Sequence, residues 1–119
     1  MSIELYNYKA TVIRVIDGDT VIFLVDTGFN CFHRITTRLL GINAPEKNRK
    51  ESKEKGLESK AYLEDLLTKG DIFIKTEKND SIGKYGRWIV EIYLKLDDGA
   101  LLDVNTHMVE TNHAVFKDY

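Results

Sequence analysis

The chain has 119 residues, of which 43% are hydrophobic, and this composition is sufficient for one compact core. We therefore expect a single domain over residues 1–119. The net charge of -2 excludes the class of protein that coats nucleic acid through bulk positive charge. Any contact with nucleic acid would have to be local.

The chain contains one cysteine, Cys31, which excludes an internal disulfide and a cysteine-based zinc site. Because Cys31 lies in an apolar-leaning stretch over residues 29–35, we expect its thiol to be buried or half-buried. Residues 1–7 contain neither the basic nor the apolar segment of a signal peptide, and no stretch is long enough to span a bilayer. These features predict a cytoplasmic protein without a membrane segment.

Three strands are predicted at the start of the chain. Residues 9–16 and 20–26 are rich in β-branched side chains and are separated by a turn signal at residues 17–19 (Asp-Gly-Asp). A third and longer strand is predicted over residues 32–42, and the sequence Asn-Ala-Pro that follows it stops the strand. Three consecutive strands joined by short turns indicate an antiparallel meander.

A charged segment and a helix are predicted next. Residues 47–55 are polar or charged throughout, which predicts a solvated loop that is less ordered than any other internal segment. Residues 57–69 have one apolar face at helical spacing and end at Gly70, so they predict a helix. The predicted buried face comprises Ser59, Tyr62, Leu63, Leu66 and Leu67.

The remaining sequence predicts two more strands and a second helix. The strands cover residues 71–77 and 87–96. Asp103 is placed to cap a helix over residues 104–111, and Asn112 follows where a left-handed terminating residue is expected. The order of three strands, a helix, two strands and a helix predicts an α+β fold that is mainly β. We expect a five-stranded OB-fold Greek-key barrel with two to three helices.

Three short strings carry the chemistry: residues 17–20 (Asp-Gly-Asp-Thr), 38–46 (Arg-Leu-Leu-Gly-Ile-Asn-Ala-Pro-Glu) and 84–87 (Lys-Tyr-Gly-Arg). Together they supply acidic oxygens for a hard cation, two arginines suited to a phosphate and a carboxylate that can accept a proton. Metal-dependent hydrolysis of a phosphodiester requires these groups. Taken singly, the first and third strings are more typical of turns. In this order the three strings resemble the staphylococcal-nuclease-like (thermonuclease) family, from about residue 10 to about residue 116.

The resemblance implies a Ca²⁺ site. It implies that Asp19 is a direct ligand, with Asp17 and Thr20 in the next sphere of groups around the ion. The second carboxylate ligand of the family falls at Asn43, whose amide oxygen can still coordinate Ca²⁺ but adds no negative charge, so weaker metal binding is expected. The next position contributes a backbone carbonyl, here that of Ala44. The alternative for the two aspartates is a solvated hairpin turn.

The resemblance also assigns catalytic roles to three residues. Arg38 and Arg87 would clamp a phosphate through paired N–H donors, and Glu46 would be the general base that activates water. Considered alone, Arg38 fits a strand arginine that reaches out to water, Arg87 fits an ordinary loop-to-strand residue, and Glu46 fits a solvated loop. Lys84 and Tyr85 match positions that contact the terminal phosphate of the substrate, although an exposed loop pair needs no such role.

Two functions are consistent with these patterns. The first is a monomeric, Ca²⁺-dependent nuclease acting on single-stranded or frayed DNA and RNA, with 5′ P–O cleavage that leaves 3′-phosphates implied by the resemblance. The second is a catalytically weak or inactive OB-fold module that binds nucleic acid or protein. The retention of Arg38, Glu46 and Arg87 favours the nuclease. Asn43 and the acidic pI of about 5.9 favour the binding module.

Overall fold

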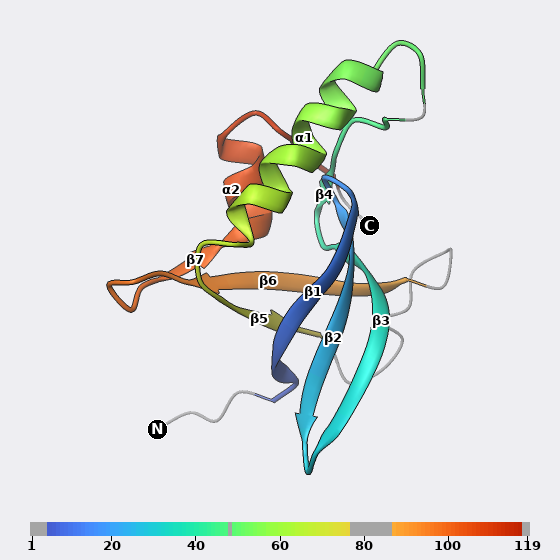
Figure 1. Cartoon of the computed structure of the whole chain (residues 1–119). Helices are drawn as coiled ribbons and strands as arrows, with labels where there is room; N and C mark the ends of the chain where they lie inside the picture. The colour runs from blue at the N-terminus through green and yellow to red at the C-terminus, as the bar shows by residue number, and fades with distance from the viewer. Residues whose placement is uncertain (1–4, 48, 77–86, 118–119) are drawn as a thin grey trace.

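The computed structural model of the chain describes residues 5–47, 49–76 and 87–117. The first three strands are β1 (Asn7–Asp17), β2 (Thr20–Gly28) and β3 (Cys31–Leu39), and each pairs antiparallel with the next (Figure 1). The predicted meander is confirmed, and its strands extend one to two residues beyond the predicted ends at several points.

The third strand is shorter at its far end than the sequence predicts. It stops at Leu39 because Gly41 has a positive φ of 79°, a conformation that turns the chain out of the strand. A separate short strand, β4 (Ile42–Asn43), then pairs with β8 (Val115–Phe116) near the end of the chain. This turn carries Asn43 away from β3 and places it at the end of the barrel.

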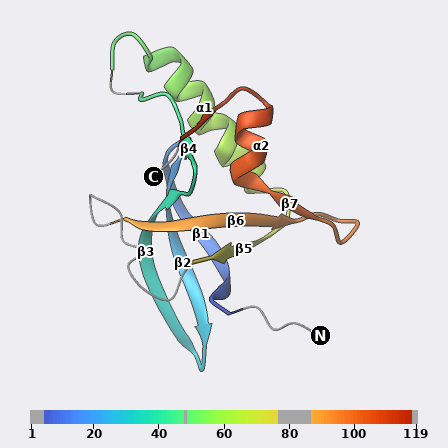
Figure 2. The ribbon, with the colours of Figure 1, turned by 180° about the vertical axis from the view of Figure 1, so that it is seen from behind.

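A five-stranded barrel closes through two further strands. β5 (Asp71–Lys75) pairs with β1, and β6 (Trp88–Lys95) pairs with β5 and, in parallel, with β3. The short strand β7 (Leu101–Asp103) lies outside the barrel on β6. Figure 2 shows β6 running across the meander, where it closes the barrel. The OB-type α+β architecture expected from the sequence is confirmed.

The core consists of alternate residues of the barrel strands, as the two-residue period of a strand requires. On β2 the side chains of Val21, Phe23 and Val25 are buried, whereas Leu24 and Asp26 between and beyond them are exposed. On β5 the alternation buries Ile72 and Ile74 and leaves Phe73 half-buried. One face of each strand therefore forms the core and leaves the other face available to ligands.

The first helix, α1 (Lys53–Leu66), begins and ends earlier than predicted. Its first turn occupies residues 53–55, so the prediction of a loop over all of residues 47–55 is wrong for that part; Asn48 lies outside the described residues. The early start has a tertiary cause: a Cβ at Gly56 would lie 2.5 Å from the backbone nitrogen of Lys47. The helix packs directly on the backbone that follows Pro45, which the charge pattern does not reveal.

The predicted buried face of α1 is largely correct. Ser59, Leu63, Leu66 and Leu67 are buried, and Tyr62 is half-buried against the core. Both helices lie at the same end of the barrel (Figure 1).

The second helix, α2 (Val104–Glu110), matches its prediction closely. The Asp103 side chain accepts a hydrogen bond from the Thr106 backbone N–H, and Asn112 has a positive φ of 63°. A buried side chain on this helix, Asn105, accepts from the Ile92 N–H and donates to the carbonyls of Leu40 and Val90. These bonds hold α2, β6 and the turn after β3 together at the site end of the barrel.

The expectation for Cys31 is wrong, because its thiol is exposed. The hairpin formed by β2 and β3 extends past the last buried residue of β2, Val25, so its tip lies beyond the core. Within the described residues, no helix has the length and apolar character needed to cross a membrane.

Candidate functional site

The side chain of Asp19 lies at the turn between β1 and β2, where it is 8% exposed. Its Oδ1 accepts a hydrogen bond of 3.0 Å from the Thr20 hydroxyl, and its Oδ2 accepts one of 2.8 Å from the Ala44 backbone N–H. The turn can approach this closely because residue 18 is glycine: a Cβ there would lie 2.8 Å from the Cβ of Ser59 and 3.0 Å from that of Ala44. Asp19 is thereby fixed between two segments of the chain.

Arg38, near the end of β3, binds the same carboxylate. Its Nη1 lies 3.2 Å from Asp19 Oδ2, and its Nη2 donates a 2.8 Å hydrogen bond to Asn43 Oδ1. The Arg38 side chain is only 8% exposed, so it does not reach out to water as a surface strand arginine would. A buried guanidinium fixed between a carboxylate and a carboxamide is held in one orientation.

Arg87, directly before β6, reaches the same place from the strand that pairs in parallel with β3. Its Nη1 donates a 3.3 Å hydrogen bond to the Thr20 hydroxyl, which itself donates to Asp19. Three segments that are distant in the sequence therefore meet at one carboxylate. We call this group the Asp19 cluster; its members are Asp19, Thr20, Arg38, Asn43, Ala44 and Arg87.

Asp17 lies beside the cluster in a half-buried position. Its Oδ1 is buried and accepts no hydrogen bond from any residue that the structure describes. Burial raises the pKa of the Asp17 carboxyl, the Lys47 ammonium opposes the rise, and the Asp19 and Glu46 carboxylates add to it. A carboxylate oxygen in this environment is poorly stabilised and would gain from a nearby positive charge.

Glu46 lies outside the Asp19 cluster. Its carboxylate is 61% exposed and pairs with Arg49 at 2.7 Å, while its backbone carbonyl accepts a hydrogen bond from the Ser52 hydroxyl. The charge of Glu46 nevertheless contributes to the raised pKa of Asp17. The two residues predicted to contact a terminal phosphate, Lys84 and Tyr85, lie outside the described residues.

Two features of the site were not predicted from the sequence. The backbone group of Ala44 that contacts Asp19 is its N–H, whereas the resemblance implied a role for its carbonyl. Lys47 is half-buried, and its positive charge lowers the pKa of Asp17 more than that of any other described residue. The only signal for Lys47 was its place in the charged run after Pro45, where one lysine cannot be distinguished from its neighbours.

The family resemblance implies a Ca²⁺ ion, which would need a set of oxygen donors at the site. The described residues contain no group of three or more His, Cys, Asp and Glu side chains that could hold a metal. They do join the carboxylate of Asp19 to the carboxamide of Asn43 through Arg38, and the buried Oδ1 of Asp17, two residues before Asp19, has no hydrogen bond among them. This set contains only oxygen donors, which fits a hard cation that accepts water as additional ligands. Few of these donors are charged.

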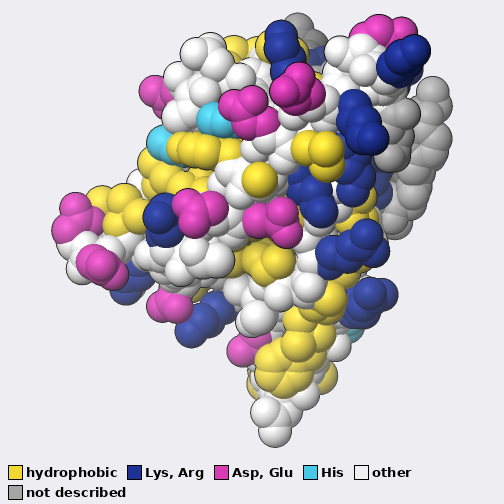
Figure 3. Space-filling view, turned by 45° about the horizontal axis from the view of Figure 1, so that its top comes forward, with side chains coloured by type: hydrophobic (Ala, Val, Ile, Leu, Met, Phe, Trp, Pro, Cys, Tyr) yellow, Lys and Arg dark blue, Asp and Glu magenta, His cyan; other side chains and the backbone are white. Residues whose placement is uncertain are grey.

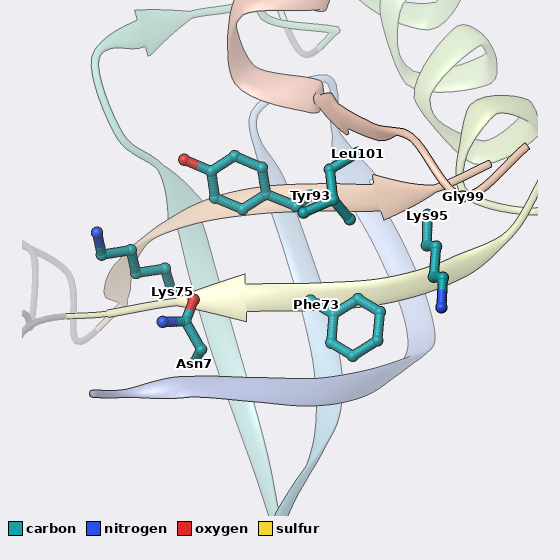
Figure 4. Close-up of a pocket in the computed structure, with 7 residues that line it drawn as sticks. All are labelled: Asn7, Phe73, Lys75, Tyr93, Lys95, Gly99 and Leu101. Carbon is teal, nitrogen blue, oxygen red and sulfur yellow. The ribbon is translucent and has the colours of Figure 1, made fainter. Parts of the chain in front are cut away.

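A separate hollow of about 540 Å³ lies on the outer side of β5 and β6 and contains no member of the Asp19 cluster. Figure 4 shows Phe73 and Tyr93 in this hollow with lysines at its two ends. Each lysine sits opposite a carboxylate on the neighbouring strand, Lys75 opposite Glu91 and Lys95 opposite Asp71. The balanced charge makes this hollow a weaker candidate for an anionic ligand than the Asp19 cluster.

Comparison with known proteins identifies the family of this chain. A search of curated proteins found no match. A family model described as staphylococcal nuclease homologue matches residues 36–119, a range that includes Arg38, Asn43, Glu46 and Arg87. Asp19 precedes the matched range and is joined to it by the contacts with Arg38 and Ala44. The chain therefore belongs to the staphylococcal nuclease family, whose domains are nuclease-type or nucleic-acid-binding modules.

Proposed function

We propose that this protein is a Ca²⁺-dependent nuclease that hydrolyses phosphodiester bonds in DNA and RNA. The observation that carries the proposal is the approach of two guanidinium groups, from Arg38 and Arg87, to the same Asp19–Thr20 pair. The two guanidinium groups provide the donors for a phosphate, and the oxygens of Asp19 and Thr20 beside them are suited to a cation. A scaffold without a ligand would gain little from burying so much charge.

The two arginines would bind and orient the phosphate. Each guanidinium can donate two parallel N–H groups to the non-bridging oxygens, and these donors strengthen as negative charge develops on the phosphate during attack. Before a substrate or cation binds, Arg38 is held beside this place by Asp19 and Asn43. Lysine would keep the charge but lose the paired geometry.

Asp19, Asn43 and the backbone carbonyl of Ala44 would hold the Ca²⁺ ion, with Asp17 and Thr20 in the next sphere of groups. The bound ion would supply positive charge to the phosphate and polarise it. Arg38 now occupies oxygens of both Asp19 and Asn43, so it would have to release part of this contact when those oxygens bind a cation. This coupling would redirect Arg38 toward the phosphate.

Glu46 would accept the proton of the attacking water as its oxygen bonds to phosphorus and the bond to the 5′ oxygen breaks. Its exposed position allows water to reach the carboxylate. The partner of Glu46 in the present structure, Arg49, is itself 70% exposed, so exchanging this ion pair for water costs little free energy. The leaving 5′ oxygen would take its proton from solvent. Lys84 and Tyr85 would contact the terminal phosphate.

One observation favours the second candidate, a binding module without catalysis. The oxygens of Asp19 and Asn43 already contact one cation of the protein itself, the Arg38 guanidinium. The negative charge of Asp19 is therefore balanced without a metal ion. Such a domain would bind the phosphates of a nucleic acid through Arg87 and surface cations but would not cut it.

Digestion of single-stranded DNA with Ca²⁺ and with a chelator tests the proposal. We expect cleavage only with Ca²⁺ and its loss in Arg87→Ala. Lys69→Ala is the matched control, because Lys69 forms an exposed ion pair with Asp65 at the end of α1 and should not affect cleavage. Binding of the DNA without cleavage under either condition would instead support the binding module.

A further inference from the structure

The Asp19 cluster continues into an exposed face of the β2–β3 hairpin. The pairing of the two strands places Thr20 opposite Arg38, Ile22 opposite Thr36 and Leu24 opposite Arg34, with Asp26 opposite Phe32 at the end. These pairs are two residues apart on each strand, and the register between them has no shift. Their side chains therefore share one face of the hairpin, the face opposite to the core.

This outer hairpin face is basic and apolar. Arg34 and Phe32 are exposed on β3, with Leu24 exposed on β2 beside Arg34. On the adjacent β1, Arg14 lies opposite Ile22, although it also shares a groove with Glu64 of α1. Figure 3 shows Lys and Arg side chains gathered next to hydrophobic side chains on the part of the molecule formed by the hairpin.

Local charge on this face differs from that of the whole chain. Across the three paired strands the face presents Lys9, Arg14 and Arg34 against two carboxylates, Asp26 opposite Lys9 and Asp17 opposite Thr20. Asp26 is partly engaged, since its Oδ1 accepts a hydrogen bond from the Gly28 N–H. The face is therefore positive, although the net charge of the protein is -2.

The tip of the hairpin carries an aromatic residue, Phe29, at a backbone conformation that is unfavourable for aromatic residues. Phe29 is 100% exposed, and its φ of 57° is followed by a φ of 59° at Asn30. Positive φ at both central residues is the geometry of a tight hairpin turn that favours asparagine and glycine, and a bulky residue there is strained. Phe29 gains no burial in return, so its ring contributes nothing to the folded state that would offset the strain.

We propose that the outer hairpin face is an extended subsite for one strand of nucleic acid, running from the Asp19 cluster to Phe29. Bases would stack on Phe32 and Phe29, and phosphates would contact Arg34 and Arg14. Aromatic rings beside cationic side chains bind single strands without sequence preference, because every base has a face that can stack. The proposal rests on the proposed function of the Asp19 cluster, because that cluster sets the start of the strand's path.

The length of this face determines how many nucleotides a bound strand needs to cover it. Arg38 and Phe32 are separated by about 20 Å at about 3.3 Å per residue. A stacked strand with about 3.4 Å per nucleotide needs about six nucleotides to cover that distance. A single nucleotide or a dinucleotide bound at the Asp19 cluster would leave the hairpin face empty, whereas an octanucleotide would reach the tip.

The test uses two oligothymidylates, a dinucleotide and an octanucleotide, with a chelator present so that neither is cut. Affinity is measured by fluorescence anisotropy, and the reaction rate of the exposed Cys31 thiol with a disulfide reagent reports on the tip. Because Cys31 is the only cysteine, the signal has one source. We expect the octanucleotide to bind more tightly than the dinucleotide and to slow the Cys31 reaction, which the dinucleotide should not do.

Two variants of the face and one control then assign the contacts. Phe29→Asn combined with Phe32→Thr removes both rings while suiting the turn and the strand, and should weaken octanucleotide binding about tenfold. Arg34→Gln should weaken it and reduce its salt dependence. Leu101→Ser is the control, since Leu101 is 62% exposed on β7 and lies outside the proposed path. Dinucleotide binding should not change in any of them.

The outcomes separate this proposal from the proposed function. If the protein cleaves short substrates with Ca²⁺ but binds both oligonucleotides equally, the hairpin subsite is overturned and the nuclease stands. If the octanucleotide binds and protects Cys31 but is not cut with Ca²⁺, the subsite stands and the nuclease fails. Binding of anionic vesicles with loss of the oligonucleotide effect would identify a membrane surface as the occupant and overturn the proposal.

Discussion

The two ends of the β2–β3 hairpin differ in what they bury. At the Asp19 end a carboxylate and a guanidinium are almost completely buried, with Arg38 at 7% exposure. At the Phe29 end an aromatic ring is completely exposed on a strained turn. Between them, the inner side chains of Val21, Phe23 and Val25 hold the hairpin against the core.

Both ends oppose the usual tendency of a folding chain. Burying a charged pair costs free energy of desolvation that its attraction only partly offsets, and exposing a large ring forgoes the gain of burial. Neither arrangement is explained by stability, and each fits a different part of one ligand: phosphate at the buried charges, bases at the exposed ring. Substitutions that change one end of the hairpin at a time should therefore have different effects.

The largest effect is expected at the buried end. Arg38→Lys or Arg87→Ala should lower the rate of single-stranded DNA hydrolysis about 100-fold or more, because an aimed donor to the developing charge is lost. Initial rates at saturating Ca²⁺ measure this effect, and thermal melts confirm that the variants fold. Rates close to that of the wild type in both variants would mean that these arginines serve the scaffold.

Adding charge to the buried end should strengthen metal binding. Asn43→Asp supplies a second carboxylate next to Asp19 and should tighten Ca²⁺ binding about tenfold, because affinity in oxygen sites rises with the number of charged ligands. Calorimetric titration with Ca²⁺ measures the affinity, and the rise of Tm with Ca²⁺ checks it independently. An unchanged affinity would indicate that Asn43 does not face the ion.

At the exposed end, a substitution should increase stability and reduce binding together. Phe29→Asn places a residue that tolerates positive φ at the strained position and should raise the free energy of unfolding by about 1 kcal/mol. Urea unfolding measures this change, and Tm should rise by about 4 °C. Since Phe29 is completely exposed, a loss of stability would show that the turn is not strained in the folded protein.

The smallest effect concerns pH and the Asp17 carboxyl beside the buried end. Because burial raises the pKa of Asp17 in the folded state, stability falls as the pH rises above the unfolded-state pKa, and the loss is complete above the folded-state pKa. Asp17→Asn should therefore be more stable than the wild type at neutral pH. The difference should shrink as the pH falls through the folded-state pKa toward the unfolded value of about 3.9. Urea unfolding at several pH values measures it, and a difference that does not depend on pH would show that ionisation of Asp17 is not its cause.

Much of the fold was predictable because its signals are local. The alternation of Val21, Phe23 and Val25 with polar or exposed residues defines β2, and the Asp103 cap and Asn112 bound α2. Strand alternation, helix caps and turn residues depend on neighbours a few positions away. The start of α1 was missed for the opposite reason: its first turn is determined by the contact of Gly56 with the backbone at Lys47.

The sequence by itself determined where the five barrel strands and the two helices occur along the chain, and which residue types are available to the Asp19 cluster. Only the tertiary structure decided which of them touch: the parallel pairing of β3 with β6 brings Arg87 to Thr20, and the turn at Gly41 brings Asn43 to Arg38. It also decided that Cys31 and Phe29 lie beyond the core. The physical reason is that the two-residue period of a strand defines which of its sides is buried. The closure of the barrel defines where the core ends and which side chains distant in the sequence come into contact.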